Sequence, residues 1–204
     1  MTATATPLTA SPVANRTAVV AAGLIAGIAC AAYVLTVIFI ADPGPVASSR
    51  LPMHLAGNAI ATCAFIALTL TLPALAVNTR LPRWALLTSA VGCALCAAMT
   101  WAMGTYVPHA LGFVTDAQAR LISDQENSIY GELFGAPKTL ACMVGFIGVG
   151  VIGFLRRAAS RWACALLVLA GVVSFLAPPW PGGALAGFAL AWIARTARPT
   201  ANSA

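Results

Sequence analysis

Long apolar runs without charged side chains most constrain what this chain can fold into. The first run covers residues 17–41 and contains no Asp, Glu, Lys or Arg before Asp42. A helix that crosses the hydrocarbon core of a bilayer needs about 20 such residues, whereas the apolar part of a cleaved signal peptide has about 7 to 15. The run therefore predicts a retained membrane-spanning helix. Only 8% of the residues are charged, against about 25% in a soluble domain, so lipid is the expected solvent for most of the chain.

The other apolar runs predict an all-α bundle of six membrane-spanning helices. Pro52 and Pro82 precede two of the runs, where a proline is tolerated because the first-turn N–H has no intrahelical partner. Residues 162–194 are too many for one crossing, and the prolines and glycines at 178–183 divide them into a tight hairpin. A re-entrant last segment is the alternative. The expected spans are about 17–41, 53–77, 83–106, 137–155, 162–177 and 182–194.

The distribution of charge predicts the topology. We expect a disordered cytoplasmic tail at 1–16, one transmembrane domain at 17–198 and a cytoplasmic tail at 199–204. Eight of the eleven basic residues then lie in the cytoplasm and all five acidic residues lie outside. This is the bias of membrane proteins, which hold Lys and Arg in cytoplasmic loops. The expectation is a multi-pass protein of the plasma (inner) membrane, and the Arg- and Ala-rich composition favours a bacterial source.

The extracytoplasmic loop, residues 107–136, collects four of the five acidic residues. Within it, residues 115–130 predict an amphipathic helix that begins with a capping box formed by Thr115 and Gln118. Such a helix caps the bundle, lies along the headgroups, or binds a membrane or extracytoplasmic protein partner. Its charged residues are Asp116, Arg120, Asp124 and Glu126.

A polar stripe runs along the second expected span. His54, Asn58 and Thr62 stand four residues apart and therefore share one helix face. They predict either hydrogen bonds between helices or the wall of an outward-facing ligand pocket. His109 and Glu132 are expected at the same outer level and complete this candidate pocket. Two facing histidines are also able to ligate a b-type haem, although no spacing motif supports one, and we predict neither a cofactor nor a metal site.

Small residues recur at helical spacing. Gly23 and Gly27 form one GxxxG motif, Gly183 and Gly187 form another, and Gly145 belongs to a glycine-rich run. Small faces let helix backbones approach closely in lipid. They predict packing within the bundle, with homo-oligomerisation as the alternative.

All six cysteines fall inside apolar runs, where they are expected to pack as small hydrophobic side chains. Cys93-Ala-Leu-Cys96 is a CxxC within a span, and it resembles the helical motif of vitamin K epoxide reductase-like membrane oxidoreductases. That family also has an extracytoplasmic cysteine pair, and this sequence has none in its loops.

Four features together resemble small six-span bacterial membrane proteins of unassigned function, over most of residues 50–198. They are Thr-Tyr-Val-Pro at 105–108 before a long loop, Arg161-Trp162 at the start of a span, the Pro/Gly hairpin, and a final Ala/Gly/Trp helix that ends at Arg195. The resemblance implies the fold and no activity.

The sequence favours a non-enzymatic protein. No span carries an ionisable residue near its centre, which argues against a proton-coupled carrier. Phosphate-binding, zinc-protease and nucleophile-elbow motifs are also absent. The net charge of +6 calls for no nucleic acid, because cytoplasmic loops account for it. We expect a protein that binds a partner or small ligand at its extracytoplasmic face, with a neutral-solute carrier or pore and a bis-histidine haem protein as alternatives.

Overall fold

The computed structural model describes residues 12–39, 52–130, 135–176 and 179–199, and these residues form helices joined by short connections. The prediction of an all-α fold is confirmed. Each of the six apolar runs forms a helix, and a further helix follows in the acidic segment. The helices are α1 (Pro12–Phe39), α3 (Pro52–Asn78), α4 (Arg83–Trp101), η1 (Ala102–Tyr106), α5 (Val107–Leu111), α6 (Asp116–Tyr130), α7 (Ala136–Leu155), α8 (Arg161–Leu176) and α9 (Pro179–Thr196).

Four helical segments are long and apolar enough to cross a membrane, which indicates a membrane protein. They are Arg16–Leu35, Pro52–Asn78, Arg83–Leu111 and Ala136–Leu155, and Arg161–Ser174 is a shorter apolar helix. Two boundaries differ from expectation. α1 begins at Pro12, inside the segment expected to be a tail, and α9 begins at Pro179 rather than near residue 182. Proline is accepted in the first turn of both helices, so neither needs to start after it.

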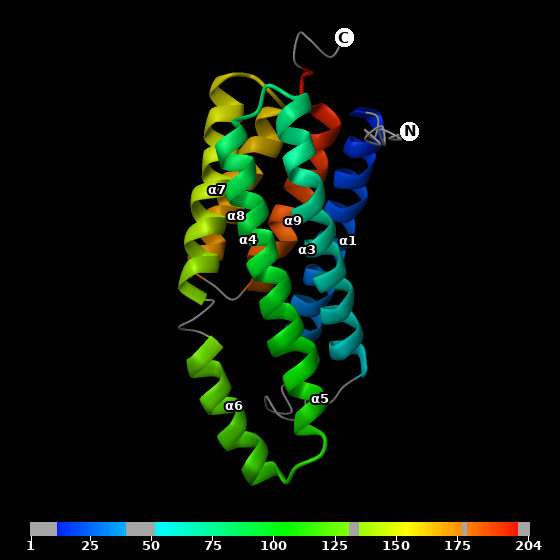
Figure 1. Cartoon of the computed structure of the whole chain (residues 1–204), viewed down its shortest axis with the longest axis vertical. Coiled ribbons are helices and arrows are strands. Elements are labelled where there is room, and N and C mark those ends of the chain that lie inside the picture. The colour runs from blue at the N-terminus through cyan, green and yellow to red at the C-terminus, as the bar shows by residue number, and fades with distance from the viewer. Residues whose placement is uncertain (1–11, 40–51, 131–134, 177–178, 200–204) are drawn as a thin grey trace, which may run out of the picture.

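Six of the described helices form a closed ring in chain order. Each packs against its neighbours along the sequence, and α1 closes the ring by packing on α9 as well as on α3 (Figure 1). α5 and α6 are not part of the ring and project from one end of it (Figure 1). The ring therefore brings the two terminal helices together.

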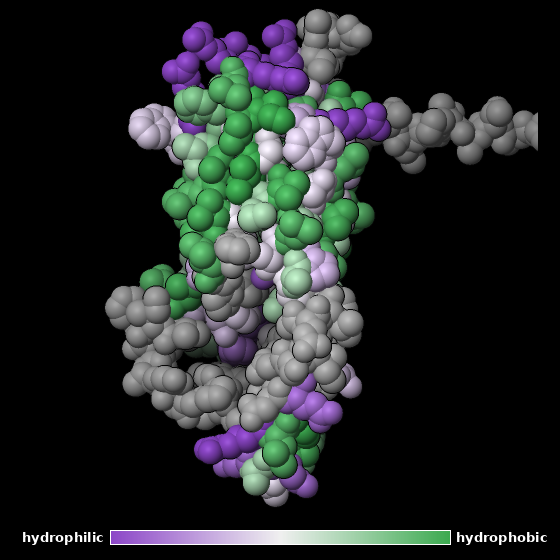
Figure 2. Space-filling model, turned by 90° about the vertical axis from the view of Figure 1, so that its left-hand side faces the viewer, coloured by the Kyte–Doolittle hydropathy of each residue, from purple (hydrophilic) through white to green (hydrophobic). Residues whose placement is uncertain are grey.

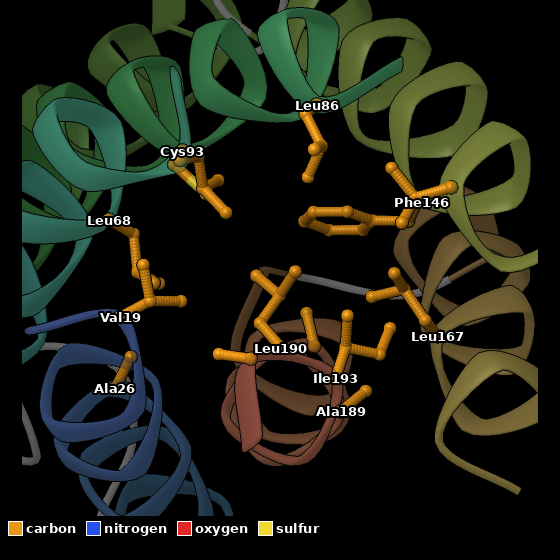
Figure 3. Packing of buried hydrophobic residues seen from close by; sticks show 14 of the residues in the cluster. Val19, Ala26, Leu68, Leu86, Cys93, Phe146, Leu167, Ala189, Leu190 and Ile193 are labelled. Carbon is orange, nitrogen blue, oxygen red and sulfur yellow. The ribbon is translucent and has the colours of Figure 1, made fainter. Parts of the chain in front are cut away.

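Apolar side chains from all six helices fill the inside of the ring. Figure 3 shows Val19 of α1, Leu68 of α3 and Leu86 of α4 pointing inward together with residues of the other three helices. Phe146, Leu167, Leu190 and Ile193 complete this layer (Figure 3). Large residues such as Leu68, Leu86 and Leu190 are buried almost completely, so the ring has a packed core at this level.

Glycines lie where the ring helices approach most closely. Gly187 of α9 packs directly against the backbone at Gly23 and Gly27 of α1. A Cβ on Gly23 would lie 2.7 Å from the carbonyl oxygen of Gly187. Gly145 faces the backbone of Ser89 on α4, and Gly183 faces Cys30 and Phe65. These are the contacts within one chain that small residues make possible in lipid.

The third apolar helix is longer than the sequence suggested. A single turn of π-helix, η1, links α4 to α5, so the helical segment runs from Arg83 to Leu111 instead of ending near residue 106. The expected loop at 107–136 therefore starts with helix. The Val107 N–H donates to the Ala102 carbonyl, five residues back, and this wider turn comes just before Pro108, which has no N–H to donate.

The two ends of the ring differ in charge. At one end, here called the arginine end, the α3–α4 connection, the α7–α8 connection and the residues after α9 meet through backbone hydrogen bonds, Arg80 N–H to Arg198 C=O and Arg198 N–H to Ala158 C=O. α5 and α6 project from the opposite end, here called the α6 end (Figure 1). Figure 2 shows hydrophilic residues at both ends and a hydrophobic band between them. Such a band is the surface that a bilayer covers.

Candidate functional site

The polar stripe of α3 lies at the α6 end of the ring and is largely turned inward. Asn58 and Thr62 are buried, and His54 is half-buried. The Asn58 side-chain amide donates to the His54 carbonyl at 2.9 Å and its oxygen accepts from the Trp180 indole N–H at 2.9 Å. The Thr62 and Thr100 hydroxyls lie 2.8 Å apart, which links α3 to α4. The stripe thus makes hydrogen bonds between helices, the first of the two roles that its spacing suggested.

Aromatic rings surround this stripe. Tyr33 of α1 stacks on Trp180 of α9, with ring centroids 4.3 Å apart and an interplanar angle of 20°. The Tyr33 ring also meets the His54 imidazole edge-on at 5.0 Å. Together with Asn58, these residues form a polar and aromatic cluster that joins α1, α3 and α9, here called the aromatic cluster. The sequence indicated neither Tyr33 nor Trp180, because their positions are far from His54 and Asn58 along the chain.

The π-helical turn contributes to the same region. Gly104 lies so close to the Asn58 side chain that no Cβ would fit between them. Among the described residues, the Thr105 hydroxyl is the buried side-chain oxygen that lacks a hydrogen-bond partner. The α6 end thus brings the polar groups of α3 and η1 together.

The structure pairs each histidine with a different aromatic ring. His54 contacts Tyr33, whereas His109 of α5 contacts Phe113 edge-on with centroids 5.3 Å apart. In the part of the chain that the structure describes, no group of three or more His, Cys, Asp or Glu residues is arranged so that it could hold a metal ion. Glu132, the remaining member of the expected pocket, lies outside the described residues. The structure tests neither the expectation that no cofactor is bound nor the alternative of a bis-histidine haem.

The acidic segment forms α6, as its pattern predicted. The capping box is confirmed: the Thr115 N–H donates to the Gln118 side-chain oxygen at 3.2 Å, and the Gln118 N–H donates to the Thr115 hydroxyl at 3.5 Å. Asp116 and Arg120 are exposed one turn apart. Asp124 and Glu126 continue the helix, and the structure does not describe their side chains.

α6 is attached through a small apolar cluster of its own. Ala119 is fully buried against Val107 and Leu111 of α5, with Val114 beside them, and this cluster is separate from the core of the ring. Apolar side chains stay exposed on the same projection: Leu121 is 72% exposed, and Phe113 and Ile122 are exposed as well. The helix therefore presents charged and apolar groups together.

A second group of reactive side chains lies between α4 and α7. The sulfurs of Cys96 and Cys142 are 3.7 Å apart, and both thiols are buried. Lys138, the only lysine of the chain, is 4% exposed and lies on α7 one turn before Cys142. The CxxC motif pointed to Cys93 as the partner of Cys96, and no spacing in the sequence indicates Cys142. Lys138, which the sequence placed at the start of the span expected at 137–155, lies in the first turn of α7.

No protein-family profile, no curated protein and no solved structure matches the chain significantly.

Proposed function

We propose that the protein is a multi-pass component of the plasma membrane that binds a protein partner through α6 on the extracytoplasmic face. In this proposal the six ring helices cross the bilayer, and both termini are cytoplasmic. The charge difference between the ends supports the orientation, because seven of the eight arginines between residues 80 and 198 lie in or beside the connections of the arginine end. The exception is Arg120 of α6. Lys and Arg near the ends of spans set orientation in this direction.

The attachment of α6 carries the partner proposal. A helix that served only to cover the bundle would bury its apolar residues against the ring. α6 instead buries Ala119 on α5 and leaves Leu121 and Ile122 exposed beside Asp116 and Arg120. Exposed apolar residues rimmed by charges are typical of protein interaction sites. The excess of acidic residues on α6 favours a partner with a basic surface.

The interior of the ring gives less support to a carrier or pore. Asn58 and Thr62 make hydrogen bonds to neighbouring helices, and Phe146, Leu167 and Leu190 occupy the middle of the ring (Figure 3). Flux of a neutral solute into liposomes that contain the protein remains the test of this alternative. An absorbance spectrum of the oxidised and reduced protein tests the haem alternative, since a bis-histidine haem would give a Soret band that His54→Ala and His109→Ala remove.

Site-specific photocrosslinking in cells tests the proposed function. A photoreactive amino acid at Leu121 of α6 is compared with one at Leu140 of α7, which is also exposed and lies on the outer surface of the ring. We expect a discrete protein adduct from position 121, weakened by Asp116→Lys, which removes an acidic group from α6, and lipid adducts alone from position 140. Replacement of residues 115–130 by a Gly/Ser linker should leave the ring folded and abolish the phenotype of the protein. Lipid adducts alone from position 121, or an unaltered phenotype after the replacement, would contradict the proposal.

A further inference from the structure

The thiols of Cys96 and Cys142 meet across the contact between α4 and α7. Helix α4 approaches α7 closely here, because a Cβ on Gly92 would lie 2.8 Å from the Cys142 sulfur and 3.0 Å from the Cys142 backbone nitrogen. A disulfide requires Cβ atoms about 3.5 to 4.5 Å apart and a bond of about 2.05 Å. Starting from 3.7 Å, the two sulfurs need to approach by about 1.7 Å, a distance that rotation of two side chains covers.

The same criterion disfavours the CxxC pair. Cys93 and Cys96 are three residues apart within α4, and Cβ atoms at that spacing lie about 5 to 6 Å apart on a regular helix. That separation exceeds what a disulfide tolerates. Cys142, whose sulfur lies 3.7 Å from that of Cys96, is therefore the better disulfide partner for Cys96. The pairing of Cys96 with Cys142 is a property of the fold and not of the motif.

Lys138 provides a positive charge beside this pair. It lies one turn before Cys142 on α7, and its side chain is buried with the thiols. A nearby cation stabilises the negative charge that a sulfur carries when it attacks an oxidant. Both thiols are buried in the apolar core of the ring, and this environment favours an oxidant that dissolves in lipid over a charged, water-soluble one.

We propose that Cys96 and Cys142 are a redox-active dithiol that organic hydroperoxides, such as those of lipids, oxidise to a disulfide between α4 and α7. One sulfur attacks the peroxide, an S–O bond forms, the O–O bond breaks, and the alkoxide leaves as an alcohol after taking the thiol proton. The second sulfur then attacks the sulfenic acid, the S–S bond forms, and the hydroxyl leaves as water with the second thiol proton. Overall, two thiols lose two electrons, and the hydroperoxide gains them to give one alcohol and one water. Lys138 is a positioning residue: its ammonium group stabilises the negative charge on the attacking sulfur.

Peptide mapping of the intact protein in liposomes tests the proposal. After cumene hydroperoxide treatment and tryptic digestion without reductant, we expect peptide 84–120 linked to peptide 139–156, at a mass lower by two hydrogens than the sum. Dithiothreitol should reverse the link. Cys96→Ser and Cys142→Ser should abolish it, whereas Cys93→Ser should keep it. Oxidised glutathione, which does not enter the bilayer, should give no link.

The contribution of the Lys138 charge is tested by the rate of disulfide formation. Lys138→Gln should slow disulfide formation by about tenfold, equivalent to about 1.4 kcal/mol, and Lys138→Arg should retain most of the rate. If a variant does not fold, peptide mapping of the wild-type protein still tests the proposal. A link that includes Cys93, no link with cumene hydroperoxide, or equal reaction with oxidised glutathione would overturn the proposal. Equal rates for Lys138→Gln and wild type would overturn the assigned role of Lys138.

Discussion

One amide side chain holds together several parts of the α6 end. Asn58 accepts a hydrogen bond from Trp180 of α9, packs against Gly104 of the π-helical turn, and returns a hydrogen bond to its own helix. In lipid there is no water to replace these bonds, so a buried amide without partners costs free energy. The aromatic cluster therefore depends on Asn58 for its geometry.

Trp180→Phe tests this dependence because it keeps a ring for Tyr33 and removes the indole N–H. We expect the free energy of unfolding to fall by about 0.6 to 1.7 kcal/mol, the range for interhelical hydrogen bonds in membrane proteins, where the unfolded chain also finds partners. Unfolding is followed in mild detergent by titration with a denaturing detergent. Trp162→Phe is the control, since Trp162 is 77% exposed and its replacement should change stability by less than about 0.5 kcal/mol. Equal losses for both variants would contradict the role of the indole.

Contacts between residues on different helices could not be predicted from the sequence. The spacing of His54, Asn58 and Thr62 correctly indicated one helix face, because periodicity within a helix is local. Trp180 is 122 positions from Asn58, and Cys142 is 46 positions from Cys96. Such contacts depend on which helices become neighbours and on how far each helix is shifted along the bundle axis. Local sequence patterns specify neither.

At the level of helices, apolar run length was the informative quantity. It located α3, α4, α7 and α8 to within a few residues, because a helix satisfies its backbone hydrogen bonds internally wherever lipid surrounds it. The extension of α4 through η1 to Leu111 was not expected, since a proline near residue 108 usually marks a helix end. The wide turn before it is a tertiary feature, stabilised where Gly104 meets Asn58.

Closure of the ring depends on the contact between α1 and α9. Gly187→Ala would place a Cβ against backbone atoms of Gly23 and Gly27, so the two helices have to separate. We expect a loss of about 1 to 3 kcal/mol in the free energy of unfolding, as for overpacked cores. Gly57→Ala is the matched control because nothing lies within 4 Å of the added Cβ. That change should be neutral or stabilise the helix by up to about 1 kcal/mol. A neutral Gly187→Ala would show that the α1–α9 contact is loose.

α6 should detach without unfolding the ring, because its apolar cluster is separate from the main core. Ala119→Asp places a carboxylate in the contact with Val107 and Leu111, where Ala119 is fully buried. We expect faster chymotrypsin cleavage near Leu121 and an unchanged melting temperature of the ring. Ala117→Asp adds the same charge at an exposed position of α6 and should leave cleavage unchanged. Parallel cleavage of both variants would indicate that the cluster does not hold α6.

For the molecule as a whole, the short final helices decide how many times the chain crosses the membrane. α8 has 16 residues and α9 has 18, about 24 and 27 Å at 1.5 Å per residue, against a hydrocarbon core of about 30 Å. Short helices still span when the bilayer thins and flanking residues extend toward the headgroups. Arg161 and Arg195, at the arginine-end termini of α8 and α9, have side chains of this kind.

A reporter inserted between α8 and α9 distinguishes two crossings from a re-entrant hairpin. We expect alkaline phosphatase to be active there and after Phe113, and inactive after Arg157 and after Arg198, because the arginine end faces the cytoplasm in the proposed topology. Green fluorescent protein at the same four positions should give the opposite pattern. The reporter is inserted within the full-length chain, so α9 is still present and the result is not affected by truncation. If the reporter between α8 and α9 behaved like the one after Arg198, the hairpin would enter and leave on one side. The ring would then cross the bilayer with four helices, and α8 and α9 would be held in the membrane by their packing on α7 and α1.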